Sequence, residues 1–247
     1  MENTTYIALS RQLALRRHMD IVANNLANMN TPAFKSESLI FIEHVQKENQ
    51  KEDADKLSFA RDIGTKRDTT EGPLLKTDNS LDLAISGDGY FLVETPLGER
   101  YTRHGRFQLD AENRLVTGQG NPLLDNGGNE INIPTNSGRV EINPDGTISV
   151  GGGVIAKIGL VSFEDEQQLR RSANNLYIAP DGVNPKEVEK PKIVQGMLEQ
   201  SNVNAIEQFT QMIQIHRSNN SLDRGMKQEH ERIMKMISRL TRRASAA

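Results

Sequence analysis

The feature that most constrains this chain is a helical apolar period at both ends of its 247 residues, separated by a long β-rich middle. Residues 4–29 contain neither glycine nor proline, and residues 205–247 contain no proline. An amphipathic helix must bury its apolar stripe against a neighbour. The two ends must therefore pair with each other, with another chain, or with both.

The N-terminal stripe repeats at steps of four, three, four and three residues. Its members are Leu15, Met19, Val22, Leu26 and Met29. Pro32 disfavours helical geometry in the residue before it, so the helix is expected to end there. Three asparagines near this end, Asn24, Asn25 and Asn28, are unusual in a helix interior because asparagine competes for backbone hydrogen bonds. Ending the helix is the simplest role for them.

The C-terminal segment carries a capping signal and two stripes. Asn204 is placed to cap a helix, and Glu207 follows three residues later, as in a capping box. The first stripe consists of Ile206, Phe209 and Ile213. The second, at alternating steps of three and four, consists of Met212, Ile215, Asn219, Leu222, Met226, Glu229, Ile233, Met236 and Leu240. A helix over this length would reach about 55 Å, so its stripe outruns the N-terminal one.

The middle of the chain is typical of short strands separated by turns. Strand-like runs lie at 81–85, 90–94, 100–109, 114–116, 139–142, 147–150 and 155–163. Sequences such as Asn126-Gly127-Gly128 separate these runs. We interpret them as turns, because glycine permits positive φ and asparagine stabilises turns. Residues 36–80 are more polar, with seven charges within residues 46–56, which is typical of a connector.

These patterns predict an α+β chain, with long N- and C-terminal helices packed as a coiled-coil-like layer and an inserted all-β central module. The predicted segments are an N-terminal helix over 1–35, an extended connector over 36–80, a β-rich module over 81–185 and a C-terminal helix over 186–247. Because the C-terminal stripe is longer than the N-terminal stripe that could cover it, part of its apolar surface is left for neighbouring copies. Packing within the chain's own domain is the competing interpretation.

Composition argues against several classes of function. The formal net charge is −3, whereas proteins that bind nucleic acid usually carry a positive excess. No run of about 18 apolar residues occurs, so we expect no membrane insertion. Residues 1–20 lack a basic region followed by an apolar one, so no cleaved signal peptide is expected. The chain has no cysteine, which excludes disulfides and a thiol nucleophile.

No motif of a catalytic or cofactor site stands out. The five histidines show no metal-ligand spacing. Gly87-Asp88-Gly89 and Gly118-Gln119-Gly120 begin like dinucleotide loops but lack the third glycine, so we interpret them as β-turns. Glu164-Asp165-Glu166 has no aromatic wall to make it a general acid, and is typical of a solvated turn. We therefore predict no enzyme activity, no catalytic residue, no cofactor and no metal.

Three motifs occur in a specific order along the chain. The first is residues 23–35 (ANNLANMNTPAFK), the second comprises 81–91 (LDLAISGDGYF), 101–107 (YTRHGRF) and 115–117 (LVT), and the third is residues 195–203 (QGMLEQSNV). Together they resemble the signatures of the flagellar basal-body rod, hook and hook-associated axial proteins. Ala33 stands where that family commonly has glycine, and Asn219-Asn220 stands where an aromatic-acidic pair is usual.

The resemblance implies a non-enzymatic structural subunit of the bacterial flagellar basal-body rod. Such a subunit would self-assemble with copies of itself and other rod proteins, transmit torque across the periplasm, and be exported by the flagellar type III apparatus without a cleaved signal peptide. The modest length and single β-module look most like the proximal-rod members, with a distal-rod protein as the alternative. A peptidoglycan hydrolase is the alternative from another class, and would require a pair of positioned carboxylates.

The residues that we expect at subunit interfaces belong to the three stripes and the asparagine cluster. They are Leu15, Met19, Val22, Asn24, Asn25, Leu26, Asn28, Ile206, Phe209, Met212, Ile213, Ile215, Leu222, Met226, Ile233, Met236 and Leu240. Heterologous contacts that do not close generate a helical assembly, in which many repeated apolar contacts would resist torque.

Overall fold

A computed structural model describes residues 2–46, 57–134 and 138–244 of the chain. It divides into two compact units. We call the first the helical unit, which consists of the described parts of residues 1–27, 37–66 and 204–247. We call the second the β unit, which consists of residues 28–36 and the described parts of 67–203. The fold is α+β, with two helices and many antiparallel strands among the described residues.

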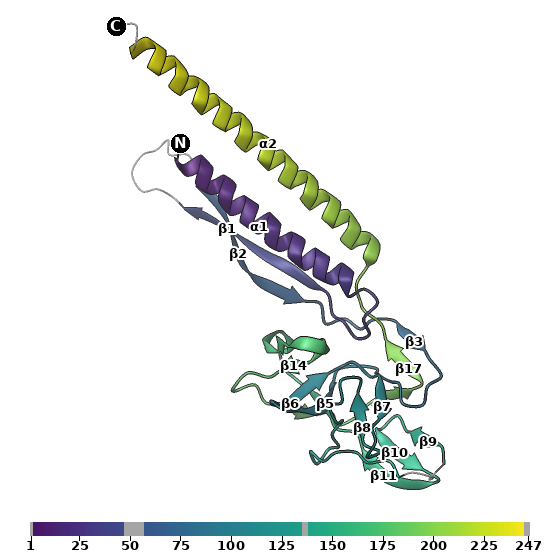
Figure 1. The fold of residues 1–247 in the computed structure, drawn as a ribbon. Coiled ribbons are helices and arrows are strands. Elements are labelled where there is room, and N and C mark those ends of the chain that lie inside the picture. Colours follow the sequence, from purple (N-terminus) through teal and green to yellow (C-terminus); the bar gives the residue numbers. More distant parts are fainter. Residues whose placement is uncertain (1, 47–56, 135–137, 245–247) are drawn as a thin grey trace. The chain divides into compact units, whose positions relative to one another are not determined.

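The helical unit is built from both ends of the chain and one pair of strands. Helices α1 (Glu2–Ala27) and α2 (Ala205–Ala244) pack side by side and run in opposite directions (Figure 1). Strands β1 (Glu37–Gln46) and β2 (Leu57–Arg67) pair with each other, and β1 packs on α1. The two predicted terminal helices are therefore present.

The start of α2 follows its capping signal. The Oδ1 atom of Asn204 accepts hydrogen bonds from the backbone N–H groups of Ile206 at 3.2 Å and Glu207 at 3.3 Å. These are two of the N–H groups that a helix cannot satisfy internally. The capping role predicted for Asn204 is therefore confirmed.

The β unit contains the remaining strands and two short 3-10 helices. Their bounds are β3 (Leu74–Lys76), β4 (Leu83–Ile85), β5 (Tyr90–Thr95), β6 (Gly98–Thr102), β7 (Phe107–Leu109), β8 (Leu115–Thr117), β9 (Val140–Ile142), β10 (Thr147–Val150), β11 (Gly153–Lys157), β12 (Leu160–Ser162), η1 (Glu166–Gln168), β13 (Arg170–Arg171), η2 (Ala173–Asn175), β14 (Tyr177–Ile178), β15 (Lys186–Glu187), β16 (Ile193–Gln195) and β17 (Met197–Glu199). The all-β central module fits the prediction.

The strands form one larger sheet and several small ones. The six-stranded sheet has the order β13-β14-β6-β5-β12-β15, and a three-stranded sheet has the order β11-β10-β9. Two-stranded pairs join β16 with β4, β17 with β3, and β7 with β8. The described pairings within the β unit are antiparallel. A short turn joins a pair such as β5 and β6, whereas other pairs, such as β14 and β6, join strands far apart in the sequence.

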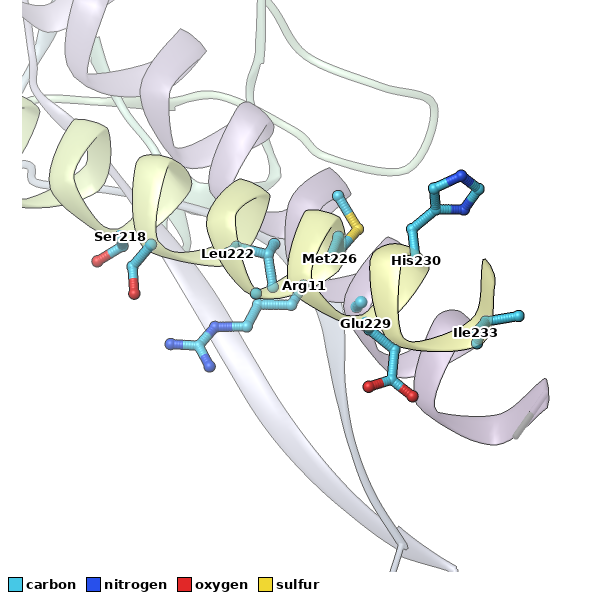
Figure 2. Close-up of a pocket in the computed structure, with 10 residues that line it drawn as sticks. Arg11, Ser218, Leu222, Met226, Glu229, His230 and Ile233 are labelled. Atoms are coloured by element: carbon cyan, nitrogen blue, oxygen red, sulfur yellow. The ribbon is translucent and has the colours of Figure 1, made fainter. Parts of the chain in front are cut away.

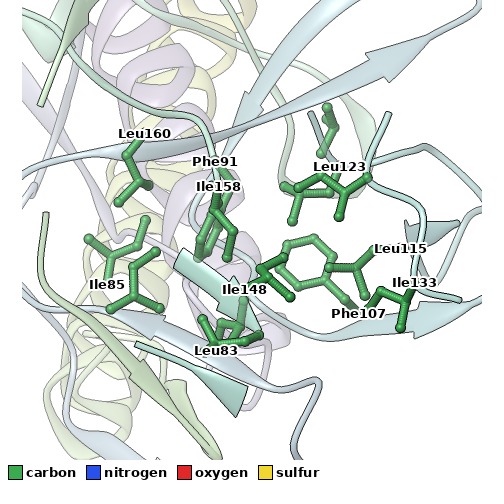
Figure 3. Close-up of a cluster of buried hydrophobic side chains, with 14 of the residues drawn as sticks. Leu83, Ile85, Phe91, Phe107, Leu115, Leu123, Ile133, Ile148, Ile158 and Leu160 are labelled. Atoms are coloured by element: carbon green, nitrogen blue, oxygen red, sulfur yellow. The ribbon is translucent and has the colours of Figure 1, made fainter. Parts of the chain in front are cut away.

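Two buried clusters hold the β unit together. Successive residues of a strand point to opposite faces, so Phe91 and Tyr90 on β5 enter different clusters. The larger cluster, shown in Figure 3, includes Leu83, Ile85, Phe91, Phe107, Leu115, Leu123, Ile133, Ile148, Ile158 and Leu160. The smaller cluster is aromatic, with the Tyr90 and Tyr177 rings 5.5 Å apart in an edge-to-face arrangement. Gly105 lets the chain pass close to β4, because a Cβ atom there would lie 1.6 Å from the carbonyl oxygen of Leu83.

Two stretches differ from the segments expected from the sequence. Residues 36–80, expected as an extended connector, contain the strands β1, β2 and β3. Residues 186–203, grouped with the C-terminal helix, contain β15, β16 and β17, and α2 begins only at Ala205. The physical reason is that β16 and β17 pair with β4 and β3, which lie more than a hundred positions earlier, and local periodicity carries no signal for such pairing.

We predict that Leu115→Ala lowers the free energy of unfolding of the β unit by about 2–5 kcal/mol, because Leu115 is fully buried and the substitution leaves a cavity. The same substitution at Leu97, which is 83% exposed, should change it by less than about 0.5 kcal/mol. Urea denaturation of both variants measures the difference. Equal losses for the two would mean that this cluster is not the core.

Candidate functional site

The long stripes of the two helices are largely covered within the chain. Val22 on α1 and Ile215 on α2 are buried. The other described stripe members that are half-buried are Leu15, Met19, Leu26, Met212, Leu222, Met226 and Ile233. Met236 is 43% exposed, and the side chain of Leu240 lies outside the described residues. Much of the predicted apolar seam is thus packed inside the helical unit.

Asn25 joins three elements of the helical unit. Its Nδ2 atom donates to the carbonyl oxygen of Glu37 at 2.8 Å and to Oε1 of Gln208 at 3.1 Å. Its Oδ1 atom accepts from the N–H group of Glu37 at 3.0 Å. Both amide groups are buried, so these bonds replace those lost to water. Asn25 therefore fixes α1 against β1 and α2, a role beyond ending the helix.

The other two asparagines of the cluster lie near the end of α1. Asn24 is exposed on the helix. Asn28 is half-buried in the turn after the helix, where its carbonyl oxygen accepts from the N–H group of Thr31 at 3.1 Å and its Oδ1 from the Thr31 hydroxyl at 3.2 Å. For Asn28, this turn agrees with the helix-ending interpretation.

The first stripe of α2 lies on a different face from the long stripe and is exposed. Ile206, Phe209 and Ile213 are 80%, 48% and 53% exposed. Residues advance by about 100° each around a helix, so Ile213 lies about 200° from the buried Ile215. On α1, Leu9 and Leu13 are exposed as well. The helical unit therefore presents apolar side chains on surfaces that its own packing does not cover.

A groove of about 750 Å³ runs along the two helices. Figure 2 labels its residues on α2, among them Leu222, Met226 and Ile233, and Arg11 on α1. Small residues, such as Ala8 and Gly225, also line it, and a Cβ atom on Gly225 would have no atom within 4 Å apart from its chain neighbours and the backbone of its own helix. The groove thus has a partly apolar lining and an open side.

A buried cluster of ions lies within the β unit. The Nζ atom of Lys35 lies 2.6 Å from Oε1 of Glu199, and the Nε atom of Arg103 lies 2.9 Å from its Oε2. The three side chains are 2%, 3% and 1% exposed for Lys35, Arg103 and Glu199. Lys35 also donates to the carbonyl oxygen of Thr70 at 2.6 Å, and the N–H group of Gly72 donates to Oε1 of Glu199 at 3.0 Å. We call these three side chains the ion cluster.

The Gly87-Asp88-Gly89 turn completes the surroundings of Arg103. Its Nη1 atom donates to the carbonyl oxygens of Gly87 and Gly89, each at 3.1 Å. The guanidinium also lies over the ring of Tyr90, 5.9 Å from its centre, and Nη2 is 3.8 Å from a carboxylate oxygen of Glu71. The carbonyl groups of this glycine turn accept from Arg103, and the N–H group of Gly87 donates to the carboxylate of Glu71.

Burial and charge compete in the ion cluster. Burial alone would raise the pKa of Glu199, but Arg103 and Lys35 outweigh it and hold that pKa below its usual range. Burial lowers the pKa of Lys35, an effect that Glu199 opposes. For Arg103, the attraction of Glu199 outweighs burial and raises the pKa. Glu199 is therefore ionised at neutral pH.

The acidic run 164–166 has structural contacts. Glu164 forms an ion pair with Lys186, Asp165 caps the 3-10 helix η1 through Gln167, and Glu166 accepts a hydrogen bond from the Tyr90 hydroxyl at 2.9 Å. Within the described parts of the chain, no group of His, Asp or Glu side chains is arranged to hold a metal ion. Over the same residues, neither helix is long and apolar enough to cross a membrane.

Three family profiles match the chain in the order of the sequence motifs. They are described as "Flagella basal body rod protein" over residues 6–35, "Flagellar hook protein FlgE/F/G D1 domain" over 84–150 and "Flagellar basal body rod FlgEFG protein C-terminal" over 194–218. The flagellar basal-body rod protein FlgF of Caulobacter vibrioides is 40% identical over 241 residues, which cover 97% of this chain and 98% of that protein. The chain belongs to the flagellar basal-body rod protein family.

Other rod proteins are similar to this chain at lower sequence identity. FlgF of Rhizobium meliloti is 33% identical over 97% of this chain and 98% of its own length. FlgG of Buchnera aphidicola is 35% identical over 81% of this chain and 85% of its own length. As a member of the rod family, the chain is a structural, non-enzymatic subunit of the bacterial flagellar basal body. The family resemblance predicted from the three motifs is confirmed.

The ion cluster was not predicted from the sequence, although each matched region of the rod family contributes one member. Lys35 ends the first matched region, Arg103 lies in the second and Glu199 in the third. The available signal was a charged residue inside each motif. Ala33 adopts φ of 55°, in the left-handed region that glycine enters without steric cost, which accounts for the glycine common there in the rod family.

We predict that Glu199→Gln lowers the stability of the β unit by about 3–5 kcal/mol at pH 7, because Lys35 and Arg103 lose their shared counter-ion. The folded-state pKa of Glu199 is lowered, so its contribution is complete above the unfolded value of about 4.3 and is lost as pH falls through the folded value. The difference in stability between the wild type and Glu199→Gln should therefore disappear in acid. Thermal unfolding at a series of pH values measures it.

The matched control is Glu141→Gln, at an exposed carboxylate on β9 of the same unit. This variant should keep both the stability and the pH profile of the wild type. A gap for Glu199→Gln that stays constant down to pH 2 would contradict the assignment of the stabilisation to an ionised Glu199.

Proposed function

We propose that this chain is a proximal-rod subunit. In this proposal, its helical unit packs with neighbouring copies and other rod proteins in a coiled-coil-like layer that transmits torque across the periplasm, and the chain is exported by the flagellar type III apparatus without a cleaved signal peptide. The observation that carries the proposal is the set of apolar side chains that α1 and α2 leave exposed although they pack on each other.

The exposed stripe of α2 is large enough to support assembly. Full burial of one Ile or Phe side chain stabilises a contact by about 1.5–3 kcal/mol before entropy costs. Ile206, Phe209 and Ile213 follow one another at steps of three and four, so a single neighbouring helix would cover them together. Repeated in every subunit, such a contact supplies the cohesion that a rod under torque requires.

The length of α2 provides a second uncovered surface. Helix α2 has 40 residues and α1 has 26, and the two run in opposite directions. At about 1.5 Å per residue, α2 is longer by roughly 20 Å. The exposed Met234, Met236 and Ile237 lie near the C-terminal end of α2. A helix of a neighbouring subunit would cover this end of α2 by packing alongside it.

Asn219 supports the same proposal from the polar side. It lies on the long stripe of α2, and its Oδ1 atom is buried with no hydrogen-bond partner among the described residues. A buried acceptor without a donor costs about 1–3 kcal/mol. A donor from a neighbouring chain would recover this loss on assembly.

The relatives favour the proximal position over the distal one. The FlgF proteins of Caulobacter vibrioides and Rhizobium meliloti align over 97% of this chain, whereas FlgG of Buchnera aphidicola aligns over 81%. A distal-rod subunit stays the alternative within the family.

We predict that Ile213→Asp abolishes or strongly reduces swimming when it replaces the wild-type chain, because a carboxylate would have to be buried without a partner in each subunit contact. Since Ile213 is 53% exposed in the single chain, the purified variant should unfold at nearly the wild-type temperature. Motility in soft agar and circular dichroism measure the two effects separately.

The matched control is Gln214→Asp, which adds the same charge at the next, exposed position of α2. Cells with this variant should swim normally. Secreted protein is measured in both strains, so that a failure of export is distinguished from a failure of assembly. Normal swimming with Ile213→Asp would show that this stripe is not a subunit contact.

A further inference from the structure

The chain passes between its two units at four places, after residues 27, 36, 66 and 203. Three of these passages adjoin short segments of the β unit, namely residues 33–36, 67–70 and 199–203. These three segments are bonded to one another, and we call them the clasp. The clasp lies wholly within the β unit, and every contact described below joins residues of that unit.

One side chain bonds to all the segments of the clasp. The Oδ1 atom of Asn202 accepts from the N–H group of Ser36 at 2.8 Å. Its Nδ2 atom donates to the carbonyl oxygens of Asp68 at 3.0 Å and Thr70 at 3.1 Å. Asn202 itself belongs to the third segment. Its side-chain amide therefore bonds to the first segment and to the second, and links all three.

Backbone bonds run beside this amide. The N–H group of Ala33 donates to the carbonyl oxygen of Glu199 at 2.8 Å, and that of Asn202 donates to the carbonyl oxygen of Phe34 at 3.2 Å. Ser36 in turn accepts from the N–H group of Asp68 at 2.8 Å. The first segment is thus held between the other two.

The ion cluster anchors the clasp to the core. Lys35 bonds to Thr70 of the second segment and Glu199 of the third, and Glu199 bonds to Arg103 of the β unit. Gly72, just beyond the second segment, approaches the third so closely that a Cβ atom would lie 2.0 Å from the carbonyl oxygen of Gln200. Because Lys35, Arg103 and Glu199 are buried, the bonds among these three side chains are stronger than they would be in water.

We propose that the clasp is a joint that transmits force, in which Asn202 is the positioning residue that makes three chain segments carry this force together. This rests on the proposed torque-transmitting function of the helical unit. A single linker under load transmits force only to its own anchor, whereas segments bonded laterally must part together. The clasp therefore opens as one cooperative unit, and load on any passage is shared with the others.

Hydrogen exchange on the full-length chain tests the cooperativity. In Asn202→Ala, the amides of Ser36, Asp68 and Asn202 should all exchange faster, by about tenfold or more, although only the Ser36 amide donates directly to the deleted group. The amides of β4 and β5 should exchange as in the wild type. Faster exchange at Ser36 alone would show independent segments and overturn the proposal.

Two further variants sharpen this result. Asn202→Asp keeps an acceptor for Ser36 but loses the donor for the second segment, so it should also speed exchange at Asp68. Asn126→Ala removes an asparagine whose side chain donates to Glu187 at 2.5 Å, and both residues are far along the chain from the clasp, so this variant should leave the clasp amides unchanged. An effect of equal size in Asn126→Ala would also contradict the proposal.

Load is tested in cells that carry the same two variants. Filament loss is counted after swimming in dilute and in viscous medium, and Asn202→Ala should lose more filaments than Asn126→Ala in the viscous medium only. Equal filament loss in the two variants, in both media, overturns the role of the clasp in transmitting force. A strain that lacks the whole chain separates the joint from the proposed function. Normal swimming of this deletion strain would contradict the proposed function itself. If the deletion strain is non-motile but Asn202→Ala and Asn126→Ala lose filaments equally, only the proposal of the joint is overturned.

Discussion

The carboxylate of Glu199 is the interaction on which the rest of the β unit depends. It is buried, so its charge requires partners, and the two cations that supply them come from residues far away in the chain, Lys35 and Arg103. Bonds from the backbone of Gly72 and to that of Thr70 complete the arrangement. The N-terminal segment and the C-terminal segment can therefore take their places in the β unit only together. One buried carboxylate thus links a residue from each of the three regions matched by the rod family.

The helical unit is stabilised by a different balance. Val22 and Ile215 are buried within it, and the buried amide of Asn25 bonds to β1 and α2, so its internal register is specified by both apolar and polar contacts. Its outer faces keep Ile206 and Phe209 exposed. The unit thus combines a defined interior with a surface that favours further packing, which is the combination expected of a structural subunit.

Local signals in the sequence were enough for some elements and not for others. The helix start at Asn204 and the turns of the central module follow from chemistry within a few residues, so they were predictable. The strand pairs β17-β3 and β16-β4 were not, because each joins segments separated by most of the β unit. The ion cluster was missed for the same reason. Asn25 was noticed as unusual, but its partners Glu37 and Gln208 could be identified only in the folded chain.

The β unit buries ion pairs, whereas the helical unit leaves apolar side chains exposed. We relate this difference to the stage at which each kind of contact forms, within the folding chain or on assembly. A buried ion pair such as Lys35–Glu199 needs close geometry and further hydrogen bonds to offset the cost of removing both charges from water, and a single folded chain provides these by itself. Apolar contacts such as those available to Ile206 and Phe209 tolerate small changes of neighbour, because burial has little directional preference. A subunit that folds first and then meets both identical and related neighbours would therefore keep its charged, directional bonds inside the chain. It would leave mainly the non-directional ones for assembly, with Asn219, whose buried Oδ1 atom has no partner among the described residues, as a polar exception.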